Sequence, residues 1–174
     1  ADAWKPSVEN NYADAFLSSE PKVALQKILT GMGVLSKVEM AGERMFTAYD
    51  NASQEDEQSC FSDNTKADLM NNIGGILNVF YGTYVRYDKS NIQVQGIDDL
   101  LKADNEKLYV ATDSLLKKCN NDIQNIAQPF DMAITAADKR PQVMEAILSV
   151  QQVGEQMSII ASTLGLTINV NSAE

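Results

Sequence analysis

Two glutamates four residues apart, Glu39 and Glu43, are the first side chains in this sequence whose spacing suggests chemistry. The pattern of the segment 21–49 predicts a helix, and side chains four residues apart on a helix lie close together. Apolar residues at helical spacing occupy the same side of this helix, namely Leu25, Ile28, Met32, Leu35 and Phe46. We therefore predict that both carboxylates are buried and need a proton, a metal ion, backbone donors or a basic partner. Arg44 and Lys37 are nearby in the sequence, so an ion pair is the alternative to a metal site.

The acidic link after this helix supplies further candidate oxygen ligands. Its carboxylates are Glu55, Asp56, Glu57 and Asp63. The first three fall in one short run, which is typical of a turn that faces solvent. Asp63 and Asn64 stand just before a second helix that begins near Thr65, and we take these two as candidate binding residues. Capping of that helix is the alternative role for them.

Asn78 is a further candidate binding residue, because the helical pattern places it at the buried edge of the second helix. From there its amide is expected to hydrogen-bond to Glu39 or Glu43. Carboxylate and amide oxygens suit hard cations such as calcium or magnesium, and suit iron with ligands from elsewhere. The candidate cofactor is therefore a divalent metal or iron, with Glu39 and Glu43 as its ligands.

Several classes of function are disfavoured by composition. The chain of 174 residues has no histidine, so it cannot form a Ser-His-Asp triad or an H-E-x-x-H zinc helix. The formal net charge of −10 argues against binding nucleic acid or an anionic membrane surface. Two cysteines, Cys60 and Cys119, are too few for a disulfide framework. Cys119 falls on an apolar stripe and is predicted to be a buried thiol.

The hydrophobic pattern predicts an all-α protein, an antiparallel bundle of about four long helices with short extra helices. The long helices are expected over residues 21–49, 65–86, 105–127 and 140–164. Residues 88–95 are expected to form a loop, and 97–103 a short helix. Gly31 and Gly42 are expected to allow close contact with another helix. The whole chain, 1–174, is predicted to be a single helical-bundle domain.

Two segments carry a resemblance to a known family. ILTGMGVLSKVEMAGERM (28–45), followed by QEDEQSCFSDNT (54–65), resembles the C-terminal half of the imelysin family, whose members are named as metallopeptidases. The SCFSDNT run is the more specific part. The resemblance implies a fold of two helical bundles related by pseudo-symmetry, with the proposed active site between them. It also implies a periplasmic or outer-membrane-associated protein of the bacterial cell envelope, often under iron control, with any lipid anchor outside this chain.

The departures from the family pattern concern the metal site. The G-x-H-x-x-E motif of the family belongs to its N-terminal half and is absent here. Gln58 and Lys66 stand where members commonly carry histidines beside the SCFSDNT run. The chain is also about half the usual length, so the expected partner is the N-terminal half-bundle of the same protein or a second copy.

Two hypotheses of function follow. The first is a non-catalytic binding module linked to the uptake of iron or another metal. The second is part of a metallopeptidase whose main metal ligands lie in a missing N-terminal half. A structural bundle with a decayed site is a third reading, which Gln58 and Lys66 favour, since a lysine beside a metal site repels the ion. We expect the chain by itself not to be an enzyme.

Overall fold

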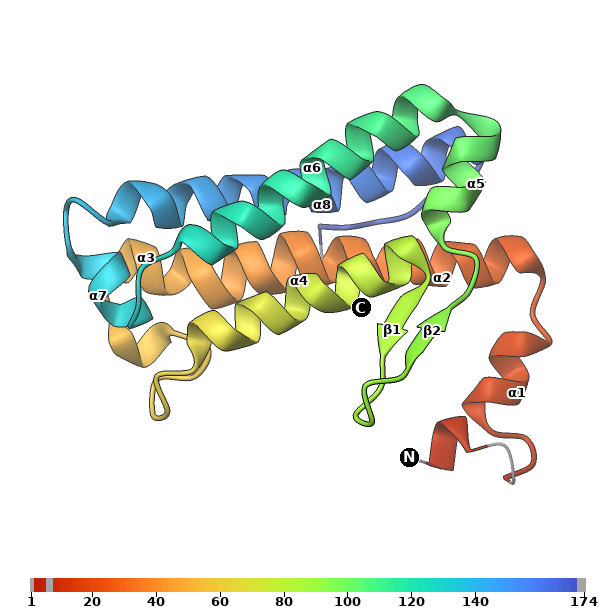
Figure 1. The fold of residues 1–174 in the computed structure, drawn as a ribbon, viewed down its shortest axis with the longest axis horizontal. Coiled ribbons are helices and arrows are strands. Elements are labelled where there is room, and N and C mark those ends of the chain that lie inside the picture. Colours follow the sequence, from red (N-terminus) through yellow and green to blue (C-terminus); the bar gives the residue numbers. More distant parts are fainter. Residues whose placement is uncertain (1, 6–7, 172–174) are drawn as a thin grey trace.

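Four long helices form the body of the molecule in the computed structural model, which describes residues 2–5 and 8–171 (Figure 1). The first runs without a break from Pro21 to Asn51. It comprises α2 (Pro21–Val34), a π-helical segment (Leu35–Phe46) and α3 (Thr47–Asn51). The others are α4 (Thr65–Tyr81), α6 (Glu106–Asn125) and α8 (Arg140–Thr163). The helices alternate in direction, so the predicted antiparallel all-α bundle is confirmed.

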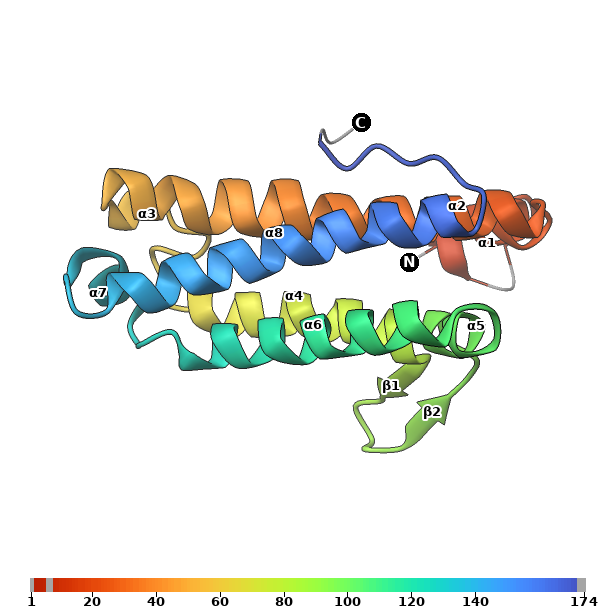
Figure 2. The same cartoon turned by 90° about the horizontal axis from the view of Figure 1, so that it is seen from above.

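Short elements join and flank these helices. They are a 3₁₀ turn (Asp2–Trp4), α1 (Tyr12–Leu17), a second 3₁₀ turn (Gln54–Asp56), α5 (Ile97–Asp104) and α7 (Phe130–Thr135). After α8 the chain runs extended beside α2, where the Gln26 side chain donates to the Thr167 carbonyl at 2.7 Å (Figure 2). The ends of the domain predicted over 1–174 (residues 1 and 172–174) lie outside the described residues.

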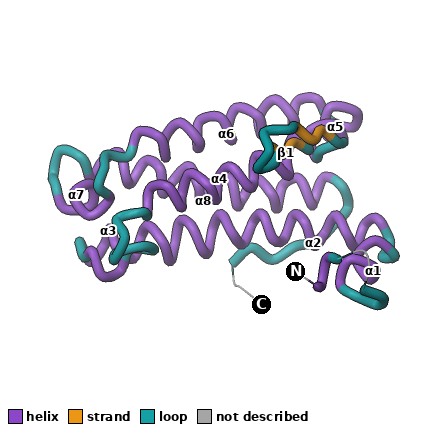
Figure 3. Tube along the Cα trace, turned by 60° about the horizontal axis from the view of Figure 1, so that its bottom comes forward, coloured by secondary structure: helices purple, strands orange, loops and turns teal. Residues whose placement is uncertain are grey.

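A β-hairpin follows α4, where the sequence pattern had predicted more helix. Gly82 adopts a left-handed conformation (φ 62°) that a glycine reaches without strain, and the helix ends there instead of at residue 86. Strands β1 (Thr83–Val85) and β2 (Asn91–Gln93) then pair antiparallel, with Tyr84 opposite Ile92. The loop expected over 88–95 is therefore partly a strand. The hairpin projects from the bundle (Figure 2) and lies next to α5 (Figure 3).

The π-helical segment changes which side chains of the first long helix face the core. Each turn of a π-helix holds more residues than an α-turn, because its hydrogen bonds join residues five apart. The buried residues are accordingly four or five apart: Ser36, Met40 or Ala41, and Met45. Leu35 is partly buried and packs against the core, as predicted, but Phe46 is 41% exposed, so the predicted stripe is wrong at Phe46.

The bundle is held together along α8, which packs against both the first long helix and α6. Its closest approach is at glycines. A Cβ atom on Gly154 would lie 2.6 Å from the Lys37 Cβ and 2.9 Å from the Gly33 carbonyl oxygen. A Cβ atom on Gly31 would have no neighbour within 4 Å, and a Cβ atom on Gly42 would meet only the Lys37 carbonyl oxygen of its own helix. The close helix contact predicted at Gly31 and Gly42 is thus found at Gly33 and Gly154.

Candidate functional site

Glu39 and Glu43 both lie on the π-helical segment, and their side chains differ in burial. Glu39 is partly buried and accepts a hydrogen bond from the Arg44 guanidinium at 3.1 Å. Glu43 is exposed to solvent, so its predicted burial is wrong. The phase shift of the π-helix explains this outcome, because it turns position 43 out of the buried stripe. The ion-pair alternative is the one that the structure shows for Glu39.

The other predicted binding residues do not converge on this pair. Asp63 is exposed and accepts a hydrogen bond from the Gln54 amide at 3.2 Å. Asn64 is the N-cap residue of α4, but its side chain makes no capping hydrogen bond. Asn78 is partly buried, and within the described residues it hydrogen-bonds to neither glutamate.

A metal site built only from the predicted residues does not fit this arrangement. Arg44 neutralises Glu39, and Glu43 faces water. Among residues 2–5 and 8–171 no three side chains of the types His, Cys, Asp and Glu come together so as to hold a metal ion. The family implies a metal, but the carboxylates on the first long helix do not form a complete coordination site by themselves.

An apolar groove lies between the first long helix, the end of α4, the hairpin and α5. Its volume is about 480 Å³, and its lining is almost entirely apolar. We call it the hairpin groove. Asn78 lies in it, together with Ile28, Val79, Ile92 and Leu100. The sequence did not predict it, because the groove depends on a hairpin that the pattern had assigned to helix and loop.

A polar pocket of about 410 Å³ lies on the other side of Thr83, between α4, α5 and α6. The Tyr81 hydroxyl donates to Asp113 at 2.8 Å, and the Lys117 ammonium is 2.7 Å from the other oxygen of that carboxylate. Burial and the hydrogen bond to Asp113 raise the pKa of Tyr81 well above its usual range. Burial works against ionisation of Asp113, but the hydrogen bonds from Lys117 and Tyr81 prevail and lower its pKa.

Asp98, at the start of α5, supplies the unsatisfied group of this pocket. It is 6% exposed, and its Oδ2 accepts from Lys102 at 2.7 Å. Its Oδ1 is buried without a hydrogen-bond partner. The Lys102 ammonium also lies 4.8 Å from the centre of the Tyr109 ring. The pocket can therefore accept a hydrogen bond from a ligand, while its basic groups are already paired with acidic ones.

Cys119 is completely buried, as predicted, and both cysteines are free thiols. Burial raises the pKa of the Cys119 thiol to about 12, so the thiolate is not formed near neutral pH. No helix of the described chain is long and apolar enough to cross a membrane.

These features define an all-α bundle with an apolar and a polar cleft at its hairpin end. The sequence profile of a peptidase family, Imelysin, matches residues 1–157. The chain therefore belongs to the imelysin family, as the SCFSDNT run and the helical segment before it indicated. A comparison with curated proteins found no match.

Solved structures share the fold at low sequence identity. An iron-regulated protein A precursor from Parabacteroides distasonis is 17% identical with a TM-score of 0.69; the similarity covers 92% of this chain and 49% of that one. An imelysin peptidase from Bacteroides ovatus is 21% identical with a TM-score of 0.68, over 97% and 52% of the two chains. The present chain thus spans about half the length of these two structures.

Proposed function

We propose that this chain is a binding module of an imelysin-type protein of the bacterial cell envelope, and that its hairpin groove binds the N-terminal half-bundle of the same protein. The hairpin groove is the observation that carries this proposal. It combines an apolar lining with a volume of about 480 Å³. The two solved structures that share the fold are about twice as long as this chain, and a second bundle would account for their additional length.

Exposed apolar side chains at the groove support a protein partner. Val79 is 45% exposed, Tyr84 54%, Val94 59% and Leu100 39%. Apolar surface gathered in one concave place is characteristic of an interaction site, since its burial contributes about 25 cal/mol per Å². A helix that inserts its apolar face between α2 and the hairpin would cover these side chains together.

The link to iron or another metal belongs to the same proposal. One of the two similar structures is named as an iron-regulated protein A precursor. Because the described residues do not complete a metal site, the partner bundle would bring the main ligands. Glu43, which faces solvent, is the oxygen donor that this chain would add, because Glu39 is paired with Arg44 and the side chains of Asp63, Asn64 and Asn78 do not converge on it. We place the protein in the periplasm or at the outer membrane, with any lipid anchor outside this chain.

A metallopeptidase is the second candidate function. It is favoured by the name of the Bacteroides ovatus structure, an imelysin peptidase, and by the polar pocket at the same end as the groove. In that case the catalytic metal would again be held mainly by the N-terminal half. Activity would appear only in the longer protein and would be lost on chelation.

The test is a binding titration between this chain and the N-terminal half of the longer protein. Val79→Asp should weaken the complex at least about tenfold, because it places a charge in an apolar contact. Val110→Asp is the matched control, since Val110 lies on α6 away from the groove and is 51% exposed. Equal affinity of the two variants would reject the groove as the binding surface. A Val79-sensitive dimer of the chain alone, seen by sedimentation, would assign the groove to a second copy.

A further inference from the structure

The polar pocket between α4, α5 and α6 is lined by hydrogen-bonding groups that the chain itself does not use. Its volume of about 410 Å³ is in the range of roughly 300–1,000 Å³ that is typical of sites for small molecules. Thr83, Tyr109 and Asn120 line it, and within the described residues the two hydroxyls and the amide of these side chains make no hydrogen bond. Hydroxyl and amide groups can both donate and accept hydrogen bonds, so the pocket can serve a ligand in either sense.

The charged side chains of the pocket are already paired with one another. The Lys102 ammonium is 2.7 Å from Oδ2 of Asp98, and the Lys117 ammonium is 2.7 Å from Oδ2 of Asp113. Each pair lies within one helix, with four residues between base and acid. The formal charges of these two acids and two bases cancel. A charged ligand would therefore gain little net attraction here, and it would have to compete with an existing ion pair.

Apolar side chains and aromatic rings form the rest of the lining. Leu77 and Tyr81 come from α4, and Tyr109 comes from α6. The Tyr81 hydroxyl donates to Asp113 at 2.8 Å, so its oxygen can only accept a hydrogen bond from a ligand. The Lys102 ammonium lies 4.8 Å from the centre of the Tyr109 ring and helps to hold that ring in place. Apolar and polar groups thus alternate around one concave surface.

We propose that this pocket binds a neutral polyhydroxylated ligand, namely a sugar unit that is either free or part of a glycan. Each hydroxyl of a sugar can donate and accept, which suits the unpaired groups of Thr83 and Asn120, and its C–H faces can pack on tyrosine rings. Asp98 lines the same pocket and has an oxygen, Oδ1, that is buried without a hydrogen-bond partner, and a hydroxyl donor would satisfy it.

Other classes of small ligand fit this lining less well. An apolar molecule would cover the polar groups without giving them partners, and an unpaired polar group in a desolvated site is costly. A metal ion is disfavoured because, over residues 2–5 and 8–171, no three side chains of the types His, Cys, Asp and Glu are grouped to hold one. The cancelled charges disfavour a simple anion or amine. A neutral hydroxyl-rich molecule is the class that remains.

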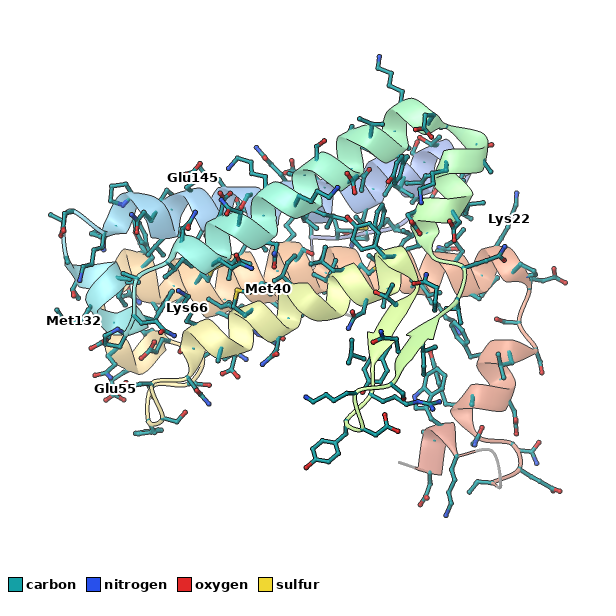
Figure 4. All side chains as sticks on the ribbon, viewed as in Figure 1. Lys22, Met40, Glu55, Lys66, Met132 and Glu145 are labelled. Carbon is teal, nitrogen blue, oxygen red and sulfur yellow. The ribbon has the colours of Figure 1, made fainter. Side chains whose placement is uncertain are left out.

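The sugar pocket is separate from the hairpin groove and from the SCFSDNT run. Val79 lines the groove and not the pocket, whereas Asn120 lines the pocket and not the groove. Figure 4 labels Glu55 and Lys66, which lie on either side of the SCFSDNT run in the sequence, at the end of the bundle opposite the hairpin. The inference therefore does not rest on the proposed partner. Val79→Asp should leave sugar binding unchanged, and Asn120→Ala should leave binding of the partner bundle unchanged.

The test is a titration of the chain with D-glucose, D-mannose, N-acetyl-D-glucosamine and myo-inositol, followed by the amide NMR signals of residues 98–120. We expect at least one of these probes to bind with a Kd on the order of 1 mM, which is normal for a ligand of this size. Asn120→Ala should weaken that binding at least about tenfold, because it removes both a donor and an acceptor. Asn71→Ala is the matched control, since Asn71 is an exposed amide on α4 outside the pocket.

A second variant protects the test against misfolding. Tyr109→Phe keeps the ring and removes only the hydroxyl, so it should weaken binding about threefold while far-UV circular dichroism stays that of the helical bundle. Absence of signal changes with all four probes, or binding that neither variant weakens, would overturn the proposal. Signal changes at the pocket with sodium phosphate or putrescine, but with none of the four probes, would also overturn it. Tighter binding of maltotriose than of D-glucose would assign the pocket to a glycan, and equal binding to a free sugar.

Discussion

Substituting Gly154 by alanine tests the packing of α8 against the first long helix. The added methyl would lie 2.6 Å from the Lys37 Cβ, 2.9 Å from the Gly33 carbonyl oxygen and 3.1 Å from the Lys37 backbone nitrogen. Two of these three atoms belong to the backbone, which cannot rotate away, so the helices must move apart. Overpacking of this kind costs about 1–3 kcal/mol.

The gain in helix propensity from glycine to alanine offsets about 1 kcal/mol of this cost. We expect Gly154→Ala to lower the free energy of unfolding by up to about 2 kcal/mol, and the melting midpoint by up to about 8 °C. Urea unfolding followed by far-UV circular dichroism measures the change. Gly75→Ala is the matched control: Gly75 is in the middle of α4, and a Cβ there has no neighbour within 4 Å.

The two alanine variants should have opposite signs. Gly75→Ala should stabilise the protein by about 0.5–1 kcal/mol, because alanine loses less backbone entropy in a helix. A Gly154→Ala variant as stable as Gly75→Ala would refute the close approach of α8 to the first long helix.

Three further predictions concern charged and reactive groups. The double variant Glu39→Gln/Glu43→Gln should change the free energy of unfolding, measured in urea, by less than about 1 kcal/mol, because the ion pair between Glu39 and Arg44 is partly exposed. A larger loss of stability would show that these carboxylates have a buried role. Because hydrogen bonds lower its folded pKa, Asp113 stabilises the fold above its unfolded pKa, and this contribution is lost as the pH falls through the folded pKa. Acid titration of stability should therefore be shallower in Asp113→Asn, and an identical slope would contradict the pairing. Cys119 should react with a thiol reagent only after unfolding, whereas partly exposed Cys60 should react in the native state; fast modification of both would contradict the burial of Cys119.

The helices could be predicted from the sequence because their signals are local. The first long helix begins at Pro21, and α8 ends before Gly165, a glycine with φ of 71°. Periodic apolar residues between such signals identify a helix whatever it packs against. The same holds for the buried thiol of Cys119.

Which side chains point to the core and which point to solvent could not be predicted in the same way. The π-helical segment is invisible to a pattern that assumes constant helical turns, and it is the reason why Glu43 is exposed and Phe46 only partly covered. The end of α4 at Gly82 was hidden by tyrosines that continue the helical spacing into the hairpin. Tertiary packing decided both outcomes.

The candidate sites were missed where they depend on contacts between distant segments. Tyr81 and Asp113 come from different helices and meet only because α4 packs against α6. Glu55, Asp56 and Glu57 are adjacent acids in the sequence, and nothing in the sequence distinguishes them. In the structure the first two are exposed and Glu57 is buried, because the turn directs their side chains differently. Burial raises the pKa of Glu57, and the charge of Asp131, more than seventy positions away in the chain, adds to this rise.

Hydrogen exchange of this chain, alone and within the longer protein, tests most directly whether the hairpin groove binds a second bundle. If the groove is the interface, backbone amides of residues 91–100 should exchange much more slowly in the longer protein, while the outer face of α6 around Val110 should not change. Val79→Asp should restore fast exchange at the hairpin. Equal exchange of residues 91–100 in the two proteins would contradict the proposed binding function of the groove.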